Sequence, residues 1–478
     1  MKILILLVAF SGSLMVTRNS LIQSNAQPQS DAQSNPQSSA SASAEAPAGF
    51  DDQSIDPAFV TQAVHDGDKT FFDEVENIDK DGLGPLYNAQ SCRECHQNPT
   101  SGGASQVMER RAGHRGPNGQ FVSASVPIND GQQVIVGRTL INDRAICPNA
   151  ANPDVQLQEH MPDAEKIRTN RLSLSVLGDG FIEAIADQTL IDLARKQCSI
   201  MNRKICGQAL PVPIVEAPGK TGIGRFGWKD QHASLLSFAG DAYLNEMGVT
   251  STLFPDEVTT LCNPKTVTEP NSQADPKDGL ADIDHFARFM RASKAPPRDE
   301  KLAATVAARN GSALFEKIGC GICHVSTLQT AKAGTAINGG KFTVPDALGD
   351  KQFHPYSDFL LHDVGTGDGI AIAVVEHYRM PRKVAEMIAS PTYSPRSVDQ
   401  VVNCENFSFK AIQDAANKIR TPPLWGVRTH GRLMHDGESL TMDDAILRHK
   451  GEAGDVTKKF KRLTTKDKSD LLAFLNSL

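Results

Sequence analysis

The sequence predicts a helix-rich chain of two domains, each organised around one copy of a five-residue motif. The copies occupy residues 92–96 and 320–324, and both follow the pattern Cys-x-x-Cys-His. Apolar residues at helical spacing precede the second copy at 311–318 and recur near the end of the chain at 467–475. With 478 residues, the chain is long enough for two or three domains.

The motif is the attachment signature of a c-type haem. Two thiols add across the two vinyl groups of one porphyrin, and the adjacent histidine becomes the proximal ligand of the iron. A Cys-x-x-Cys pair alone would also suit a redox dithiol or half of a zinc site. The histidine that follows both pairs argues against those alternatives, so we expect two covalently bound haem c groups. The residues expected to hold them are Cys92, Cys95, His96, Cys320, Cys323 and His324.

The first residues resemble an export signal. One lysine is followed by an apolar run that ends at Val16, which is short for a membrane span. We expect a signal peptide at 1–26, with an uncleaved anchor as the alternative. A disordered Gln/Ser/Ala-rich linker is expected at 27–49. Because c-type haem is attached outside the bacterial cytoplasm, the expected location is the periplasm, with membrane contact only if the segment stays uncleaved.

Helical periodicity also appears at 61–73, 233–247 and 282–290, and a short β-like run lies at 133–136. Pro296 and Pro297 follow the third of these helices, so we place a domain boundary there. The N-terminal haem domain would span 50–297 and the C-terminal one 298–478. The net charge of −7 argues against nucleic acid as a partner.

Five of the nine cysteines lie outside the motifs, namely Cys147, Cys198, Cys206, Cys262 and Cys404. An oxidising compartment favours disulfides among the first four. Cys198 and Cys206 would close the shortest loop, although the sequence does not fix the connectivity. The odd number leaves at least one cysteine unpaired or intermolecular, and a buried inert thiol is favoured over a reactive one.

Several further segments carry a family resemblance. They are 82–88, 224–228, 245–248, 253–255, 354–358, 361–363, 420–427, 432–437 and 445–452. Together they resemble the di-haem oxidoreductase family, which is related to the bacterial di-haem cytochrome c peroxidases, over roughly residues 60–478. The resemblance implies a mainly α fold, with two cytochrome c-like domains packed together, long loops and a few short strands. It also implies a catalytic N-terminal haem and a C-terminal haem that relays electrons to it.

The resemblance assigns roles to three residues. His449 occupies the place where the peroxidases carry the methionine that ligates the C-terminal iron, so it is the expected sixth ligand there. Met434 and Met442, which are nearby, are expected to pack rather than to ligate. Glu246, in the counterpart of the peroxidase acid loop, is the expected acid/base over the N-terminal iron. Trp228 resembles the tryptophan between the haems.

Two details of the family pattern are less complete. Ser237 lies near the place where the peroxidases carry a glutamine ahead of the acid. The family's calcium site between the domains would draw on Asn170 and the backbone of 421–423, so one calcium ion is a further expected cofactor.

The leading interpretation is a periplasmic di-haem oxidoreductase that reduces peroxide. Its electrons would come from a small donor protein, a cytochrome or cupredoxin, or from a quinol-linked chain. The alternatives are an electron-transfer cytochrome with two six-coordinate irons, and an oxygen-dependent oxidase of an organic or protein substrate. The sixth position of the N-terminal iron decides between them. The histidines left open for that position are His65, His114, His160 and His232.

Overall fold

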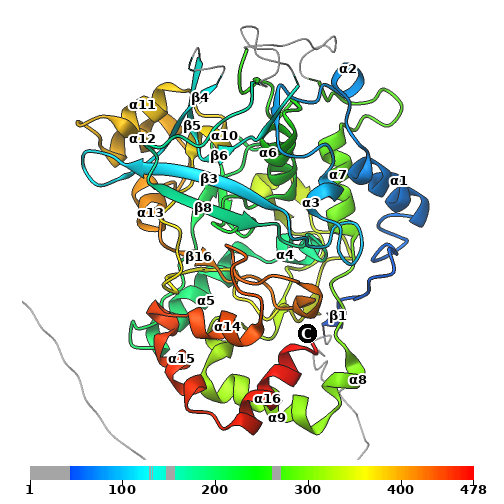
Figure 1. Cartoon of the computed structure of the whole chain (residues 1–478). Helices are drawn as coiled ribbons and strands as arrows, with labels where there is room; N and C mark the ends of the chain where they lie inside the picture. Colours follow the sequence, from blue (N-terminus) through cyan, green and yellow to red (C-terminus); the bar gives the residue numbers. More distant parts are fainter. Residues whose placement is uncertain (1–42, 129–130, 132, 147–156, 261–270) are drawn as a thin grey trace, which may run out of the picture. The chain divides into compact units, whose positions relative to one another are not determined.

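Helices and small sheets alternate along the chain. The computed structural model describes residues 43–128, 131, 133–146, 157–260 and 271–478. Helices make up 35% of the structure and strands 16%. The expectation of a mainly α fold with a few short strands is therefore corrected to a mixed fold with several sheets (Figure 1).

The largest sheet has five strands and lies after the first motif. Its order is β5-β4-β3-β6, and β8 pairs with the opposite edge of β3 from β4 and β6. Gly113 lies opposite Ser123 in the antiparallel β3–β4 pair, and Arg110 lies opposite Asn170 in the β3–β8 pair. The strands are β3 (Met108–Arg115), β4 (Phe121–Ile128), β5 (Gln133–Arg138), β6 (Leu140–Ile141) and β8 (Ile167–Leu172). Their charged and small residues hide the β pattern, which the sequence showed only at 133–136.

The other strands are short. Those that precede the second motif are β1 (Ala44–Glu45), β2 (Leu86–Tyr87), β7 (Arg144–Ala145), β9 (Pro211–Pro213) and β10 (Thr221–Ile223). Those that follow it are β11 (Leu328–Gln329), β12 (Ala336–Ile337), β13 (Phe342–Thr343), β14 (Lys351–Phe353), β15 (Leu361–His362) and β16 (Ile419–Arg420). Because β1 pairs in parallel with β14 and Ala46 is buried, residues 43–49 are ordered, against the expectation of a linker that reaches residue 49.

The helices around the first motif include three that the sequence predicted. The helices of this region are α1 (Gln62–Asp73), α2 (Ile78–Asp81), α3 (Cys92–Cys95), α4 (Asp179–Glu183), α5 (Asp187–Ile200), α6 (Leu235–Met247) and α7 (Asp282–Ala292). Thr61 and Ser234 cap α1 and α6 by accepting backbone N–H groups. Gly248 ends α6 at a φ of 69°, where a Cβ would lie 2.6 Å from the Leu86 carbonyl oxygen. The predicted helices at 61–73, 233–247 and 282–290 are confirmed.

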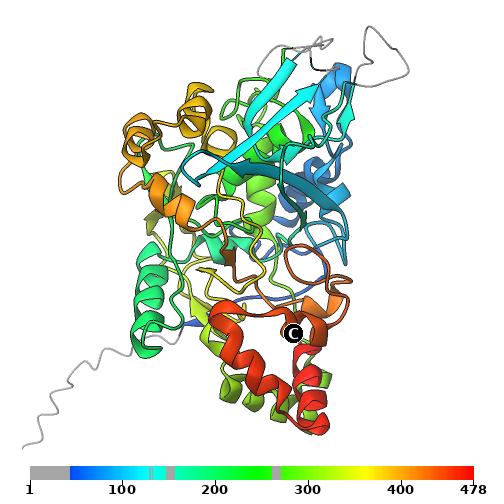
Figure 2. The same cartoon turned by 60° about the vertical axis from the view of Figure 1, so that its left-hand side comes forward.

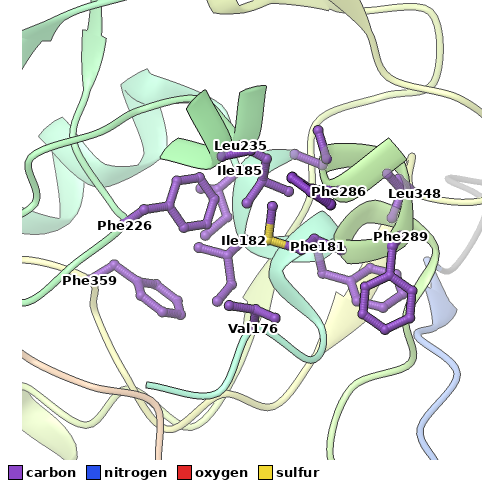
Figure 3. Close-up of a cluster of buried hydrophobic side chains, with 14 of the residues drawn as sticks. Val176, Phe181, Ile182, Ile185, Phe226, Leu235, Phe286, Phe289, Leu348 and Phe359 are labelled. Carbon is purple, nitrogen blue, oxygen red and sulfur yellow. The ribbon is translucent and has the colours of Figure 1, made fainter. Parts of the chain in front are cut away.

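The main core lies under these helices and draws on both halves of the chain. Figure 3 shows Phe181 and Ile182 of α4 packed among Phe226, Phe286 and other apolar side chains. Full burial of each such side chain contributes about 1.5–3 kcal/mol. Leu348 and Trp425 come from beyond residue 297 and join the same core. The division at 297/298 stays a prediction, and residues 43–478 form one contact unit.

A second core belongs to four helices that the sequence analysis missed. They are α10 (Val374–Tyr378), α11 (Lys383–Ala389), α12 (Pro395–Val402) and α13 (Phe409–Asp414). Val384, Val398 and Phe409 are buried there together with Phe121 of β4. In Figures 1 and 2 these helices, coloured yellow to orange, lie beside the five-stranded sheet.

A third core supports the second motif. The helices of this region are α8 (Glu300–Ala303), α9 (Val306–Ile318), α14 (Met442–Arg448), α15 (Gly454–Lys461) and α16 (Thr465–Leu475). Phe315 of α9 and Phe474 of α16 pack edge to face with centroids 5.3 Å apart. Gly311 lets the two helices meet, because a Cβ there would lie 2.0 Å from the Asp470 carbonyl oxygen. The predicted helices at 311–318 and 467–475 are confirmed.

Cys198, on α5, forms a disulfide with Cys206, as the short loop suggested. Cys404 is a free, partly buried thiol, while Cys147 and Cys262 lie outside the described residues. The predicted signal peptide and most of the predicted linker also lie outside them. Of the helices in the described part of the chain, none has the length and apolar character that a membrane crossing requires.

Candidate functional site

Each motif lines a cavity of its own. In the first motif, Ser91 caps α3 by accepting the N–H of Glu94 at 3.2 Å, which fixes the turn that carries the cysteines. Cys92, Cys95 and His96 all line this cavity, named here the N-terminal cavity. Its other described walls come from α6, α7, β3 and residues 171–176.

The second motif begins where α9 ends. Gly319 stops α9 at a φ of 107°, and a single 3-10 turn then carries the cysteines. Cys320, Cys323 and His324 line the second cavity, named here the C-terminal cavity. Its remaining walls come from α14, α15, α16 and residues 419–435.

The residues of both cavities fit a haem. The four motif cysteines are free thiols rather than disulfides, as thioether attachment requires. The Nδ1 atom of His324 lies 2.9 Å from the Tyr356 carbonyl oxygen; donation by Nδ1–H leaves Nε2 for an iron. Burial, and then the nearby His449, lower the pKa of His324 to about 4, which favours the neutral imidazole that ligates metals.

The structure places His449 in the C-terminal cavity with His324. Thr441 caps α14, and His449 follows the last helical residue as its C-cap, rather than lying within the helix. Its Nδ1 lies 2.7 Å from the Ala445 carbonyl oxygen, so that Nε2 is again the nitrogen left for a metal. Ala445 and Ile446 line the cavity as expected, whereas Leu447 is exposed. Both Met434 and Met442 also line the cavity.

Three other histidines line this cavity, His362, His430 and His435, and two of them are placed differently from His449. His362 has both ring nitrogens beside carboxylates, with Nε2 2.9 Å from Asp358 and Nδ1 2.8 Å from Glu452. No ring nitrogen of His362 is left for an iron while those contacts hold. His435 is buried, and its ring meets Trp228 edge-on with centroids 6.1 Å apart.

The N-terminal cavity has a different lining. Among its described lining residues, His96 is the only histidine. Two of the four histidines left open for this iron are held elsewhere by carboxylates: His114 Nδ1 lies 2.8 Å from Glu165, and His232 Nε2 lies 3.0 Å from Asp241. His65 packs against Phe289, and neither it nor His160 lines the cavity.

Glu246 lies in the last turn of α6 and lines the N-terminal cavity. The backbone N–H of Asn88 donates to its carbonyl oxygen at 2.7 Å, which ties α6 to the loop before the first motif. The Asn88 side-chain amide donates to its carboxyl group at 3.1 Å. Burial, and then the neighbouring Glu109 carboxylate, raise the pKa of Glu246 well above its ordinary value.

Glu109 and Arg111 of β3 line the same cavity, and the sequence analysis missed both. Arg111 donates to both carboxylate oxygens of Glu109, at 2.5 and 3.0 Å, and to Glu376 of α10 at 2.8 Å. Burial would raise the pKa of Glu109, but Arg111 outweighs it and holds that pKa below its usual value. No local signal marks Glu109, since Glu246 and Glu376 are distant in sequence.

A shared wall separates the two cavities. Trp228 and Arg420 line both, together with residues 172–175. The Trp228 indole N–H donates to the Leu172 carbonyl oxygen at 2.7 Å, and the Arg420 backbone N–H donates to the Trp228 carbonyl oxygen at 2.9 Å. Trp228 thus lies where the resemblance would place it, between the two motifs.

The remaining expectations concern Ser237 and calcium. Ser237 is buried away from the cavity, where its hydroxyl donates to Glu216. A glutamine is nevertheless present, because Gln231 lines the N-terminal cavity. In the described chain, the groups spaced to hold a metal are His232–Asp241–His377 and Cys323–Asp358–His362. Both groups consist of His, Cys and Asp side chains, whereas the expected calcium ligands are Asn170 and the backbone of 421–423, so the calcium site stays a prediction.

Comparison with known proteins completes the evidence. Residues 124–374 and 408–478 match the family model described as "Di-haem oxidoreductase, putative peroxidase". No curated protein matches the chain. Among solved structures, Kuenenia stuttgartiensis hydrazine synthase is 22% identical and covers 41% of this chain, with a TM-score of 0.23. A MauG-like protein associated with microbial copper homeostasis is 18% identical and covers 43%, also at 0.23.

Each of these matches spans 55% of the other protein's chain, and such TM-scores carry no argument about the arrangement. The family match covers more than half of the sequence. It includes the second motif and walls of the C-terminal cavity, among them Trp228 and His449. On this evidence, the chain belongs to the di-haem oxidoreductase family.

Proposed function

We propose that this protein is an exported di-haem c-type oxidoreductase that reduces peroxide in the N-terminal cavity. The observation that carries the proposal is the difference between the two linings. His324 and His449, each with Nδ1 beside a backbone carbonyl oxygen, are among the histidines of the C-terminal cavity, whereas the described lining of the N-terminal cavity offers one histidine and several carboxyl groups. Such a difference suits one iron that carries electrons and one iron with a displaceable position.

When bound, the two haems supply the redox chemistry: the C-terminal one stores and passes on electrons, and the N-terminal one binds the peroxide and delivers electrons to it. The chain's own residues do the rest. His96 and His324 would each ligate one iron, and His449 would be a second ligand in the C-terminal cavity. Glu246 handles protons beside the substrate, and Trp228 lies in the wall that electrons would cross.

The partners follow from this scheme. Reduction of a peroxide to water needs two electrons, which we assign to a small donor cytochrome or cupredoxin, or to a quinol-linked chain. Covalent attachment of both haems requires export, so we place the protein in the periplasm, anchored to the membrane only if residues 1–26 stay uncleaved. Calcium binding between the halves would stiffen the wall that contains residues 421–423.

A single-turnover experiment tests the function. The holoprotein is half-reduced with one electron equivalent, mixed with hydrogen peroxide, and followed by stopped-flow absorbance. The proposal predicts rapid oxidation of the ferrous haem, and one peroxide consumed per two electrons when a donor keeps the protein supplied. A half-reduced protein that leaves peroxide intact, while a donor still exchanges electrons with both haems, would identify a plain electron carrier.

A further inference from the structure

The carboxyl groups of Glu109 and Glu246 are held by very different partners. Arg111 donates a bidentate pair of hydrogen bonds to the two carboxylate oxygens of Glu109. This arrangement strongly favours the ionised carboxylate. Glu246 has a neutral amide, that of Asn88, as its hydrogen-bond donor at 3.1 Å. Glu109 and Glu246 are both partly buried, and their carboxyl groups lie in contact in the lining of one cavity. Two such carboxyls cannot both ionise cheaply, so the one without a direct cation retains the proton.

We propose that Glu109 and Glu246 share one proton above the first motif, with Glu109 as the general base and Glu246 as the general acid of peroxide cleavage. This assignment rests on the proposed function and changes one part of the expectation from the sequence. There, Glu246 alone was to take a proton and return it. A protonated Glu246 serves as an acid from the start, and the base is its partner on β3.

The surroundings agree with this division. The charged groups that face the pair are Arg111 on β3 and Arg171 on β8, and both favour an ionised Glu109. The Glu109 carboxylate in turn favours a protonated Glu246. Arg111 also donates to Glu376, so a turn of Arg111 toward Glu246 would break the buried Arg111–Glu376 ion pair.

The step balances as follows. The Glu109 carboxylate takes a proton from one peroxide oxygen, and Glu246 gives its proton to the other oxygen. The O–O bond breaks with its electron pair on that second oxygen, which leaves as water. The proton on Glu109 then crosses the shared hydrogen bond to Glu246, which restores the pair. The first oxygen is left two electrons short, and the two electrons from the donor with two protons from solvent reduce it to the second water. Over the full cycle, peroxide with two protons and two electrons thus gives two waters.

Infrared difference spectroscopy of the ferric holoprotein tests the shared proton without any turnover. The proposal predicts a protonated-carboxyl band, sensitive to D₂O, that disappears in Glu246→Gln. In Glu109→Gln the same band should titrate at lower pH, because the neighbouring negative charge that raises the pKa of Glu246 is then gone. A band that survives in Glu246→Gln at full strength, or an unchanged titration in Glu109→Gln, would overturn the pair.

Peroxide kinetics then test the roles. Removal of either group should slow the reaction roughly 10²–10⁴-fold. Glu246→Gln should lose the high-pH limb of the rate profile and Glu109→Gln the low-pH limb. Because the two act as a unit, the double variant should be about as slow as the slower single variant. A wild-type rate with an intact low-pH limb in Glu109→Gln would mean that Glu246 works alone.

Glu159→Gln is the matched control, since this buried glutamate pairs with Arg138 at 3.2 Å and does not line the cavity. It should keep the wild-type rate. If the wild-type protein does not react with peroxide, the proposed function fails, and the infrared result still decides whether the proton is shared.

Discussion

The two cavities carry the same attachment motif and differ in what faces it. Five carboxyl-bearing residues are among the described lining of the N-terminal cavity, namely Glu109, Asp143, Asp179, Asp241 and Glu246. The described lining of the C-terminal cavity has none, and contains His449 together with the motif histidine. Groups that can donate or accept protons thus line the N-terminal cavity, and a histidine that can ligate an iron lines the C-terminal cavity. The difference teaches that Cys-x-x-Cys-His fixes where a haem sits, while its chemistry is set by residues that come from elsewhere in the chain.

The largest effect is expected when one haem is removed at a time, which tests whether each motif holds its own haem. Cys92→Ala with Cys95→Ala should yield a protein that carries one haem, and so should Cys320→Ala with Cys323→Ala, because each pair attaches its own porphyrin. Intact mass spectrometry of protein made with a haem-attachment system measures the difference. The unaltered chain, with two haems, is the control. A holoprotein without two haem additions would remove the basis of the account.

Replacing His449 should make the C-terminal site resemble the N-terminal one. His449→Ala should leave that iron high-spin or water-ligated and abolish electron storage. His449→Met should keep it six-coordinate and raise its potential, within the roughly 0.8 V range that axial ligands span. Near-infrared spectra and redox titration report both effects. A methionine-to-iron band already present in the unaltered protein would instead make Met434 or Met442 the ligand.

The acid sensitivity of the N-terminal side should depend on Glu376. Burial alone would raise the pKa of Glu376, but Arg111 and His377 outweigh it and lower the pKa to about 2. A lowered pKa contributes stability that is present above about pH 4.5 and lost as the pH falls toward 2, roughly 3 kcal/mol in all. Urea unfolding of Glu376→Gln should therefore lose this part of the acid dependence.

Glu405→Gln provides the control for that measurement. Glu405 pairs with Lys220 at 2.8 Å on the surface, where such a pair contributes about 0–1 kcal/mol. Its acid dependence should match that of the unaltered protein. Equal acid dependence in Glu376→Gln and Glu405→Gln would show that the ion pairs behind the N-terminal cavity do not stabilise it.

Trp228→Phe should change the stability of the fold least among these variants. It should act specifically on electron exchange between the two haems. An aromatic ring is kept, and the lost hydrogen bond to Leu172 costs about 0.5–1.5 kcal/mol. Electron equilibration between the cavities should slow, as followed by flash photolysis of the half-reduced, carbon monoxide-bound protein. Trp425→Phe, a buried change in the wall of the C-terminal cavity alone, is the control. An unchanged rate in Trp228→Phe would leave Trp228 a packing residue.

Much of the helical framework could be predicted from the sequence. Caps such as Thr61 and breaks such as Gly319 are local signals, and the helices that they bound were found. The five-stranded sheet was missed because β3 carries Glu109, Arg110 and Arg111, whose charges hide the alternation of a strand. Those charges are tolerated there because Arg111 pairs with Glu109 on the same strand and with the distant Glu376, while Arg110 is exposed.

The residues of the candidate site also divide into those that the sequence predicted and those that it did not. The motif residues are contiguous and are evident from the sequence, and His449 follows from a spacing that the family resemblance supplies. Glu109 could not be found, because its significance depends on Arg111 beside it and on Glu246, which is far away in sequence. Gln231 was missed for a similar reason, since Ser237 stood nearer to the expected place while the fold turns Gln231 into the cavity.

The central claim is that one iron has a displaceable position and the other has two histidines. Low-temperature EPR of the oxidised and half-reduced holoprotein tests it most directly. The account predicts that reduction by one electron removes a low-spin ferric signal that is absent from His449→Ala, and that a high-spin ferric signal appears or persists. Two low-spin signals in the oxidised protein, with no high-spin signal at half-reduction, would contradict it.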